Sequence, residues 1–314
     1  MARFDLDQYP LWTALVTPLN ESGAIDFDCL TQLVSAQAQA QNGVLLLGST
    51  GEGLALTDSE HRTVVEHVVS LQIDVPLMVA VGGADLAAQS AWIAWCNDKA
   101  VDGYLLATPM YAKPGPVGQQ QWFGELLDTA THPCMIYNVP SRSGINLDVN
   151  TLGALSHHDN FWAIKEASGD LALFEAYAEA CQGVRVYSGD DALYPAQAGI
   201  GAAGLVSVCA NAWPVATHNY VSYHLSNRNE QIDNNWQQAL DYLGQGAANP
   251  IPVKVLMHRL GQMATPYLRA PLIHLELSSD EHLLLADNLI SDWAVAHLQT
   301  FSDISPVINQ QVVA

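Results

Sequence analysis

Short apolar segments alternate with amphipathic helical patterns along most of this chain. Segments of this kind, bounded by polar or glycine-containing turns, are typical of buried parallel strands that helices connect. Eight strands are predicted, at residues 11–19, 44–48, 77–81, 103–108, 134–137, from 161 onward, 184–187 and 204–208. Eight strands that alternate with helices predict a closed (β/α)8 TIM barrel. A doubly wound sheet is the alternative, but the turn after the first strand, at residues 17–20, lacks the phosphate-binding glycines which that fold requires.

The pattern changes near residue 228, after which helices are predicted without further strands. These helices span residues 231–244, 253–262 and 281–299. We therefore divide the chain into a barrel that carries the active site (1–228) and a C-terminal helical extension (229–314). In such barrels the functional groups lie at the C-terminal ends of the strands, so the candidate catalytic residues are those at the predicted strand ends.

The net charge, the apolar segments and the cysteines restrict the binding partners and the cellular location that can be expected. The net charge is −21, and only four lysines and seven arginines occur among 314 residues, which excludes nucleic acid and anionic membranes as partners. Neither a membrane-spanning apolar run nor a signal peptide is recognised. The five cysteines are odd in number and widely spaced, so we expect a cytoplasmic protein without a disulfide framework or a metal site.

Lys165 is the main candidate for catalysis. It lies near the end of the apolar strand that begins at Phe161. Burial disfavours the charged form of a lysine, and the neutral amine is the nucleophile that forms a Schiff base with a carbonyl substrate. A lone lysine more often extends its ammonium to water. Whether Lys165 is catalytic or only structural therefore depends on the residues at the other strand ends.

Three further strand ends carry polar groups that suit the same chemistry. The turn at Gly48–Gly53 offers the hydroxyls of Ser49 and Thr50 and several backbone N–H groups, which suit a small carboxylate. Tyr137 ends the strand beside that of the lysine and could transfer protons. Arg142 follows it and could bind a second carboxylate through two hydrogen bonds. Taken singly, each could be structural: the glycine-rich segment could be only a turn, Tyr137 a core residue, and Arg142 part of an ion pair that braces its loop.

Taken together, these segments resemble the pyruvate-dependent aldolase superfamily of dihydrodipicolinate synthase and N-acetylneuraminate lyase. The resemblance covers roughly residues 10 to 275, and the matching segments are 48–52, 137–144, 164–169, 188–191, 206–211 and 249–254. Arg142, within its Pro-Ser-Arg-Ser-Gly segment, looks like the synthase rather than the lyase. Ser49 departs from the synthase pattern, which usually has threonine there, but it keeps the hydroxyl.

The resemblance implies condensation of pyruvate with aspartate 4-semialdehyde, in the biosynthesis of lysine and diaminopimelate, without a cofactor. It implies a homotetramer, a dimer of dimers in which Tyr111 reaches into the active site of a neighbouring subunit. The implied roles are a Schiff base on Lys165, proton transfer by Tyr137, a relay from Ser49 to Tyr111, pyruvate carboxylate binding at Ser49 and Thr50, aldehyde carboxylate binding by Arg142, and pocket walls from Gly189 and the Val206 carbonyl.

Two other functions remain open on the sequence. A sugar-acid aldolase of the same superfamily, such as a 2-keto-3-deoxy acid or N-acetylneuraminate lyase, would share Lys165 and Tyr137 but would not need Arg142 in the same role. A non-catalytic homologue would only bind 2-oxo acids.

The resemblance also bears on regulation by free lysine, which binds many relatives at the interface of the tight dimer. The matching positions here are Gly53, Asp58, His61, Asp85, Gln89 and Met110. Gln89 and Met110 replace an anion and a phenol, and Asp85 would repel the lysine carboxylate. We therefore expect weak inhibition by lysine, or none.

Overall fold

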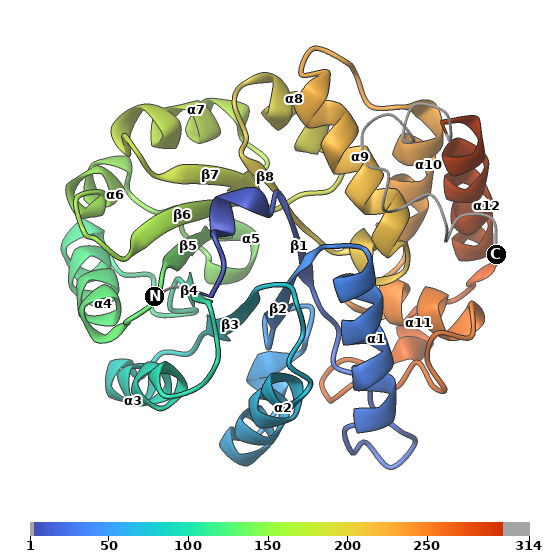
Figure 1. Cartoon of the computed structure of the whole chain (residues 1–314), viewed down its shortest axis with the longest axis horizontal. Coiled ribbons are helices and arrows are strands. Elements are labelled where there is room, and N and C mark those ends of the chain that lie inside the picture. The colour runs from blue at the N-terminus through green and yellow to red at the C-terminus, as the bar shows by residue number, and fades with distance from the viewer. Residues whose placement is uncertain (1–2, 298–314) are drawn as a thin grey trace.

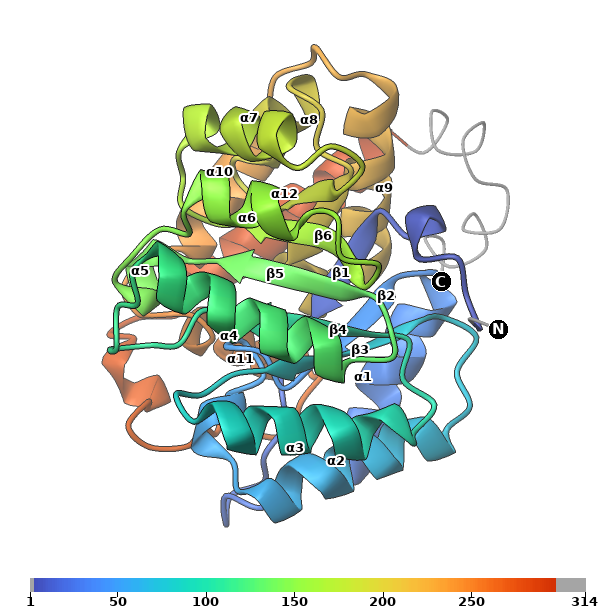
Figure 2. The ribbon, with the colours of Figure 1, turned by 90° about the vertical axis from the view of Figure 1, so that its left-hand side faces the viewer.

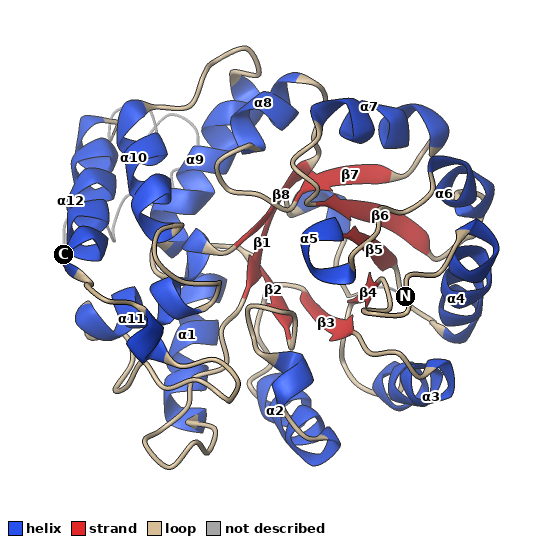
Figure 3. Cartoon of the chain, turned by 180° about the vertical axis from the view of Figure 1, so that it is seen from behind, coloured by secondary structure: helices blue, strands red, loops and turns tan. Residues whose placement is uncertain are grey.

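The computed structural model describes residues 3–297 (Figure 1). Eight parallel strands form a closed barrel in chain order, and the last strand pairs with the first. The strands lie inside a ring of helices, as Figure 3 shows. The strands are β1 (Leu11–Ala14), β2 (Gly43–Leu46), β3 (Leu77–Val81), β4 (Gly103–Ala107), β5 (Cys134–Asn138), β6 (Phe161–Glu166), β7 (Arg185–Ser188) and β8 (Gly204–Ser207). The predicted (β/α)8 TIM barrel is confirmed.

Six of the helices in the described part of the chain begin at a side-chain cap. Before the second helix, Thr57 and Glu60 form both hydrogen bonds of a capping box. None of the helices between residues 3 and 297 is both long and apolar enough to cross a membrane. They are α1 (Phe27–Gln39), α2 (Asp58–Ser70), α3 (Leu86–Asn97), α4 (Pro116–Thr129), α5 (Pro140–Ser143), α6 (Val149–Leu155), α7 (Leu171–Ala180), α8 (Tyr194–Gly199), α9 (Pro214–Ser226), α10 (Asn234–Leu243), α11 (Ile251–Arg259) and α12 (Glu281–Ala296).

The first strand is shorter than its apolar pattern predicted, because β1 ends at Ala14 and not near residue 19. Leu15 and Val16 are fully buried, as strand residues would be. The N–H of Val16, however, donates to the side-chain oxygen of Asn211, which lies after β8. A buried loop whose backbone groups bond to side chains has the same apolar composition as a strand, so periodicity could not separate the two.

The interior of the barrel is filled by side chains. Alternate residues of the strands point inward and form one core, which includes Trp12, Leu45, Met78, Leu105, Met135, Ala163, Tyr187 and Val206. Such packing makes the barrel a core and not a pore, which leaves the strand ends as the place for a substrate. Figure 2 shows β5 from the side, with α5 at the end toward which the strand points and the N-terminus of the chain at the opposite end.

The C-terminal helices pack against the barrel through aromatic rings. Tyr220 of α9 stacks on Trp236 of α10, with ring centroids 4.2 Å apart. Trp236 in turn meets Trp293 of α12 edge to face, with ring centroids 5.3 Å apart. Figure 1 shows α10 and α12 side by side next to α9. The boundary at residue 228 stays a prediction, and the predicted end of the last helix at residue 299 lies outside the described residues.

Candidate active site

Lys165 and Tyr137 lie side by side at the ends of their strands. Lys165 on β6 pairs in register with Tyr137 on β5, so both side chains point to the same side of the sheet. The lysine is only 5% exposed. Its Nζ atom lies 4.3 Å from the centroid of the tyrosine ring. The amine and the phenol are therefore close enough to act on one bound molecule.

Burial changes the acidity of both groups. It lowers the pKa of Lys165 to about 8, an effect that the Asp191 carboxylate opposes and the Arg142 guanidinium reinforces. At pH 7 roughly one molecule in ten then carries the neutral amine, against about one in 3,000 for an unperturbed lysine. Burial also raises the pKa of Tyr137 to about 12, with Arg142 and a hydrogen bond to Ser49 acting in the opposite direction. The tyrosine therefore keeps its proton and is able to donate it.

A cavity of about 400 Å³ opens beside these two side chains. Six of the eight predicted site residues line it: Ser49, Thr50, Tyr137, Arg142, Lys165 and Gly189. They come from the ends of four different strands (β2, β5, β6 and β7), which only closure of the barrel brings together. The cavity is of a size that suits a small metabolite.

Gly189 allows the lysine side chain to fit. A Cβ atom at this position would lie 2.9 Å from Cε of Lys165 and 2.7 Å from Cβ of Ala167. The backbone N–H of Gly189 donates to the carbonyl of Glu166 at 2.7 Å, which holds it against β6. A side chain here would therefore displace the lysine.

The turn that carries Ser49 and Thr50 is held by contacts from distant parts of the chain. Thr50 accepts a hydrogen bond from the side-chain amide of Asn249 at 3.0 Å. The carboxylate of Glu52 accepts from Nζ of Lys254 at 2.6 Å and from the backbone N–H of Arg269 at 2.7 Å. The sequence of the turn indicated its two hydroxyl groups, but it could not indicate these hydrogen bonds from distant residues.

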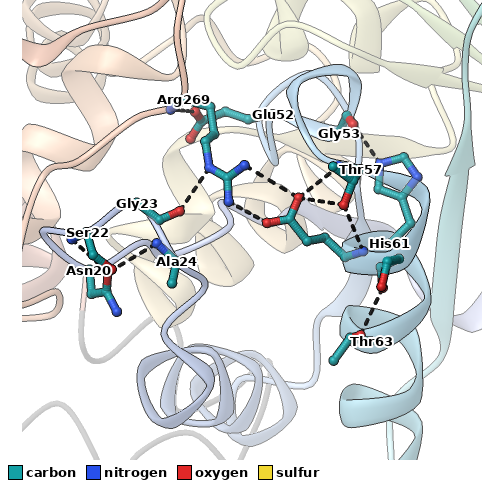
Figure 4. Close-up of polar contacts among 12 residues, drawn as sticks. Asn20, Ser22, Gly23, Ala24, Glu52, Gly53, Thr57, His61, Thr63 and Arg269 are labelled. Carbon is teal, nitrogen blue, oxygen red and sulfur yellow. Dashed lines mark hydrogen bonds and ion pairs between the residues drawn. The ribbon is translucent and has the colours of Figure 1, made fainter.

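Arg269 extends this support to the start of α2. Figure 4 shows its guanidinium bonded to the carbonyl of Gly23. The guanidinium also pairs with the carboxylate of Glu60, which closes the capping box with Thr57. The same close-up shows His61 bonded to the carbonyl of Gly53. One arginine therefore ties three loops together at this end of the barrel.

Arg142 lies on α5 at the mouth of the cavity and is exposed. Its guanidinium donates to the carbonyl of Asn249 at 3.2 Å. One N–H is therefore used to orient the side chain, while the other donors of the guanidinium remain available for a carboxylate.

Two predicted site residues lie elsewhere. The side chain of Val206 belongs to the inner core of the barrel, and Val208 lines the cavity two residues later. The predicted role concerns the carbonyl of Val206 and stays a prediction. Tyr111 is 97% exposed, has a positive φ of 67°, and does not line the cavity within its own chain.

Other wall residues were missed by sequence reasoning. Leu240 and Leu243 of α10 and Asn249 before α11 close one side of the cavity, and Asp191 lies beside Gly189. The segments that contain Asn249 and Asp191 had been recognised, but no role had been given to either residue. The leucines carried no local signal, because an apolar helix face looks the same whether it covers a core or a cavity.

A second cavity, of about 280 Å³, lies next to the first and shares Ser49, Tyr137 and Arg142 with it. Five of the positions matched to the lysine pocket line it: Gly53, Asp58, His61, Gln89 and Met110. Asp85 does not line this cavity within the single chain. Its carboxylate accepts from the N–H of Ala88 and caps α3 instead.

Among residues 3–297, no three His, Cys, Asp or Glu side chains are grouped so that they could hold a metal ion. All five cysteines are free and buried.

Comparison with known proteins agrees with this arrangement. Residues 9–288 match the profile of the Dihydrodipicolinate synthetase family. A 4-hydroxy-tetrahydrodipicolinate synthase from Wolbachia pipientis subsp. Culex pipiens (strain wPip) is 46% identical over 284 residues, which are 90% of this chain and 96% of that protein. A dihydrodipicolinate synthase from Bacillus anthracis has a similar crystal structure, with a TM-score of 0.82 and 29% identity over 90% of this chain and 97% of that one. The enzyme from Acinetobacter baumannii, solved as a complex with pyruvate, has a TM-score of 0.81 and 28% identity over 90% and 98% of the two chains. This chain therefore belongs to the dihydrodipicolinate synthetase family.

Proposed function

We propose that the protein is a 4-hydroxy-tetrahydrodipicolinate synthase, which condenses pyruvate with aspartate 4-semialdehyde through a Schiff base on Lys165. The observation that carries the proposal is the buried lysine beside Tyr137 in a cavity with a guanidinium at its mouth. The relative from Acinetobacter baumannii, whose structure contains pyruvate, supports the first substrate.

The reaction starts from the neutral amine of Lys165. It attacks the ketone carbon of pyruvate, and the carbinolamine loses water to give a protonated imine. Loss of a methyl proton to a base gives an enamine, whose carbon adds to the aldehyde of the second substrate. The amino group of that substrate then attacks the imine carbon, the ring closes and Lys165 leaves as the free amine.

The neighbouring residues bind the substrates and transfer protons in this scheme. Ser49 and Thr50 hold the pyruvate carboxylate through their backbone N–H groups. Tyr137, which keeps its phenolic proton, donates it to the departing hydroxyl and takes it back later. Arg142 binds the carboxylate of the semialdehyde. Gly189 and Val208 form walls of the cavity, and the carbonyl of Val206 completes the pocket.

The relay is completed by a second subunit in this proposal. Tyr111 stands out from the chain; Met110 and Val117, nearby in the sequence, and Leu54, which lines the second cavity with Met110, are also exposed. Apolar and aromatic side chains of this kind favour burial between subunits. Tyr111 then reaches Ser49 of a neighbour, within a homotetramer of two tight dimers, and a cytoplasmic location fits the five free thiols.

A trapping experiment tests the proposed function. Pyruvate with borohydride should attach one reduced adduct, on Lys165, and the unreacted enzyme should convert aspartate 4-semialdehyde faster than sugar aldehydes. An adduct on Lys113 or Lys254 would refute the mechanism. Preference for a sugar aldehyde would instead identify the sugar-acid aldolase, and an adduct without turnover of any aldehyde would identify a 2-oxo-acid-binding homologue.

A further inference from the structure

Asp191 lies in the wall of the catalytic cavity and has no part in the chemistry described above. It follows β7, but its carboxylate is held by the end of β8. Oδ1 accepts from the hydroxyl of Ser207 at 2.5 Å and from the thiol of Cys209 at 3.0 Å. Oδ2 accepts from the backbone N–H groups of Val208 at 2.9 Å and Cys209 at 3.4 Å.

These contacts are those of an ionised carboxylate. The two backbone N–H groups are able only to donate, so Oδ2 carries no proton. Burial raises the pKa of the Cys209 thiol well above its usual value, so the thiol keeps its proton and donates as well. Burial of Asp191 raises its own pKa, and the same donors oppose that rise.

The carboxylate is also closed to the substrate. A carboxylate has about four lone-pair sites, and here each oxygen of Asp191 already accepts two hydrogen bonds. The backbone carbonyl of the same residue accepts from the phenol of Tyr220 at 3.3 Å, which holds the loop from its other side. Asp191 is therefore a fixed charge that neither binds a ligand nor receives a proton from it.

The other charged groups near Lys165 do not supply a negative charge to its amine. Arg142 and Tyr137 are a cation and a neutral phenol. Asp190 uses one oxygen to accept from the N–H groups of Ala192 and Leu193, which lie in the turn before α8. Glu166, the next residue of β6, points to the other face of the sheet and is bonded to Asn138 and Ser168. Of the charges in the described part of the chain, Asp191 is thus the one that favours a cation on Lys165.

We propose that Asp191 is a positioning residue whose fixed negative charge stabilises the cationic states of Lys165, namely the ammonium and the protonated imine with pyruvate. The inference rests on the proposed function, since the imine is formed only if Lys165 is the Schiff-base residue. A cationic imine is the electron sink of the reaction, and a fixed counter-charge lowers its energy without reorganisation at the moment of reaction.

Asp191→Asn tests the role, with Asp190→Asn as the matched control from the same loop and the same cavity. The readout is the pH dependence of pyruvate-dependent borohydride labelling at Lys165, together with the dissociation constant of the imine. We expect Asp191→Asn to move the acid limb of the labelling profile to lower pH and to weaken the imine by about tenfold or more, as one charge does over several ångströms in a partly buried site. Asp190→Asn should leave the acid limb in place. An unchanged limb in Asp191→Asn, or equal shifts in both variants, would overturn the proposal.

The two proposals fail in different ways. If the unmodified enzyme is not labelled at Lys165, the proposed function is wrong; if it is labelled and the Asp191→Asn profile matches it, only the role of Asp191 is wrong. Circular dichroism checks the fold of each variant. Should Asp191→Asn not fold, Asp191→Ala with added formate replaces it, and formate that occupies the vacated space should restore the acid limb. A limb that formate does not move would overturn the proposal.

Discussion

The buried ion pair between Glu52 and Lys254 allows a quantitative prediction. The two side chains are 1% and 0% exposed, and their charged atoms lie 2.6 Å apart. Nζ of Lys254 also donates to the carbonyl of Thr17 at 2.9 Å. Lys254→Met keeps much of the volume of the side chain but removes its charge. The Glu52 carboxylate then stays buried with the N–H of Arg269 as its remaining donor in the described structure, and the Thr17 carbonyl loses its partner.

Removing one member of such a pair costs about 3–5 kcal/mol, because the other charge remains desolvated without compensation. That loss is a large part of the 5–15 kcal/mol that typically separates a folded domain from its unfolded state, so roughly a third of the stability is expected to go. The double variant Glu52→Gln/Lys254→Met removes both charges. The side-chain oxygen of the new glutamine can still accept the hydrogen bond from the backbone N–H of Arg269. We expect it to be more stable than Lys254→Met by about 2 kcal/mol or more.

The free energy of unfolding is measured by urea titration with circular dichroism. Lys99→Met is the control, because Lys99 pairs with Glu66 at 3.0 Å while the two side chains are 27% and 56% exposed. A surface pair of this kind contributes about 1 kcal/mol or less. The reasoning is refuted if Lys254→Met costs no more than Lys99→Met, or if the double variant is no more stable than the single one.

Three other predictions concern binding and assembly. Arg142→Ala should lower kcat/KM for the semialdehyde, with a loss of transition-state stabilisation of about 2–4 kcal/mol, while borohydride labelling with pyruvate is nearly unchanged. Equal losses for both substrates in steady-state kinetics would indicate that Arg142 only braces its loop. Tyr111→Phe should lower turnover, and mixing it with Lys165→Ala should restore activity in hybrid oligomers measured by sedimentation and assay; a fully active monomer would contradict the shared site. Free lysine should inhibit weakly or not at all, since Gln89 and Met110 line the second cavity at the two positions matched to an anion and a phenol; cooperative inhibition below millimolar lysine would show the opposite.

The sequence determined the architecture and the centre of the site. Strands that alternate with helices left a strong periodic pattern, and the barrel places every strand end at one mouth. Lys165 and Tyr137 could therefore be paired in advance, since each ends a strand and the strands are neighbours. The polar residues after the other strands followed from the same rule, and Ser49, Arg142 and Gly189 do line the cavity.

Only the tertiary structure decided which hydrogen bonds hold the site residues and which other residues line the cavity. Residues 15–19 were predicted as strand because a buried loop is as apolar as a strand. The backbone N–H of Val16 bonds to the side chain of Asn211, which lies almost two hundred residues away in the sequence. The family resemblance matched Asp85 to a lysine pocket, whereas its carboxylate caps α3 in the folded chain. The fixed charge of Asp191 depends on donors from another strand. Local pattern reports burial and periodicity, but hydrogen bonds between distant segments exist only after the barrel has closed, and these bonds set the charges around Lys165.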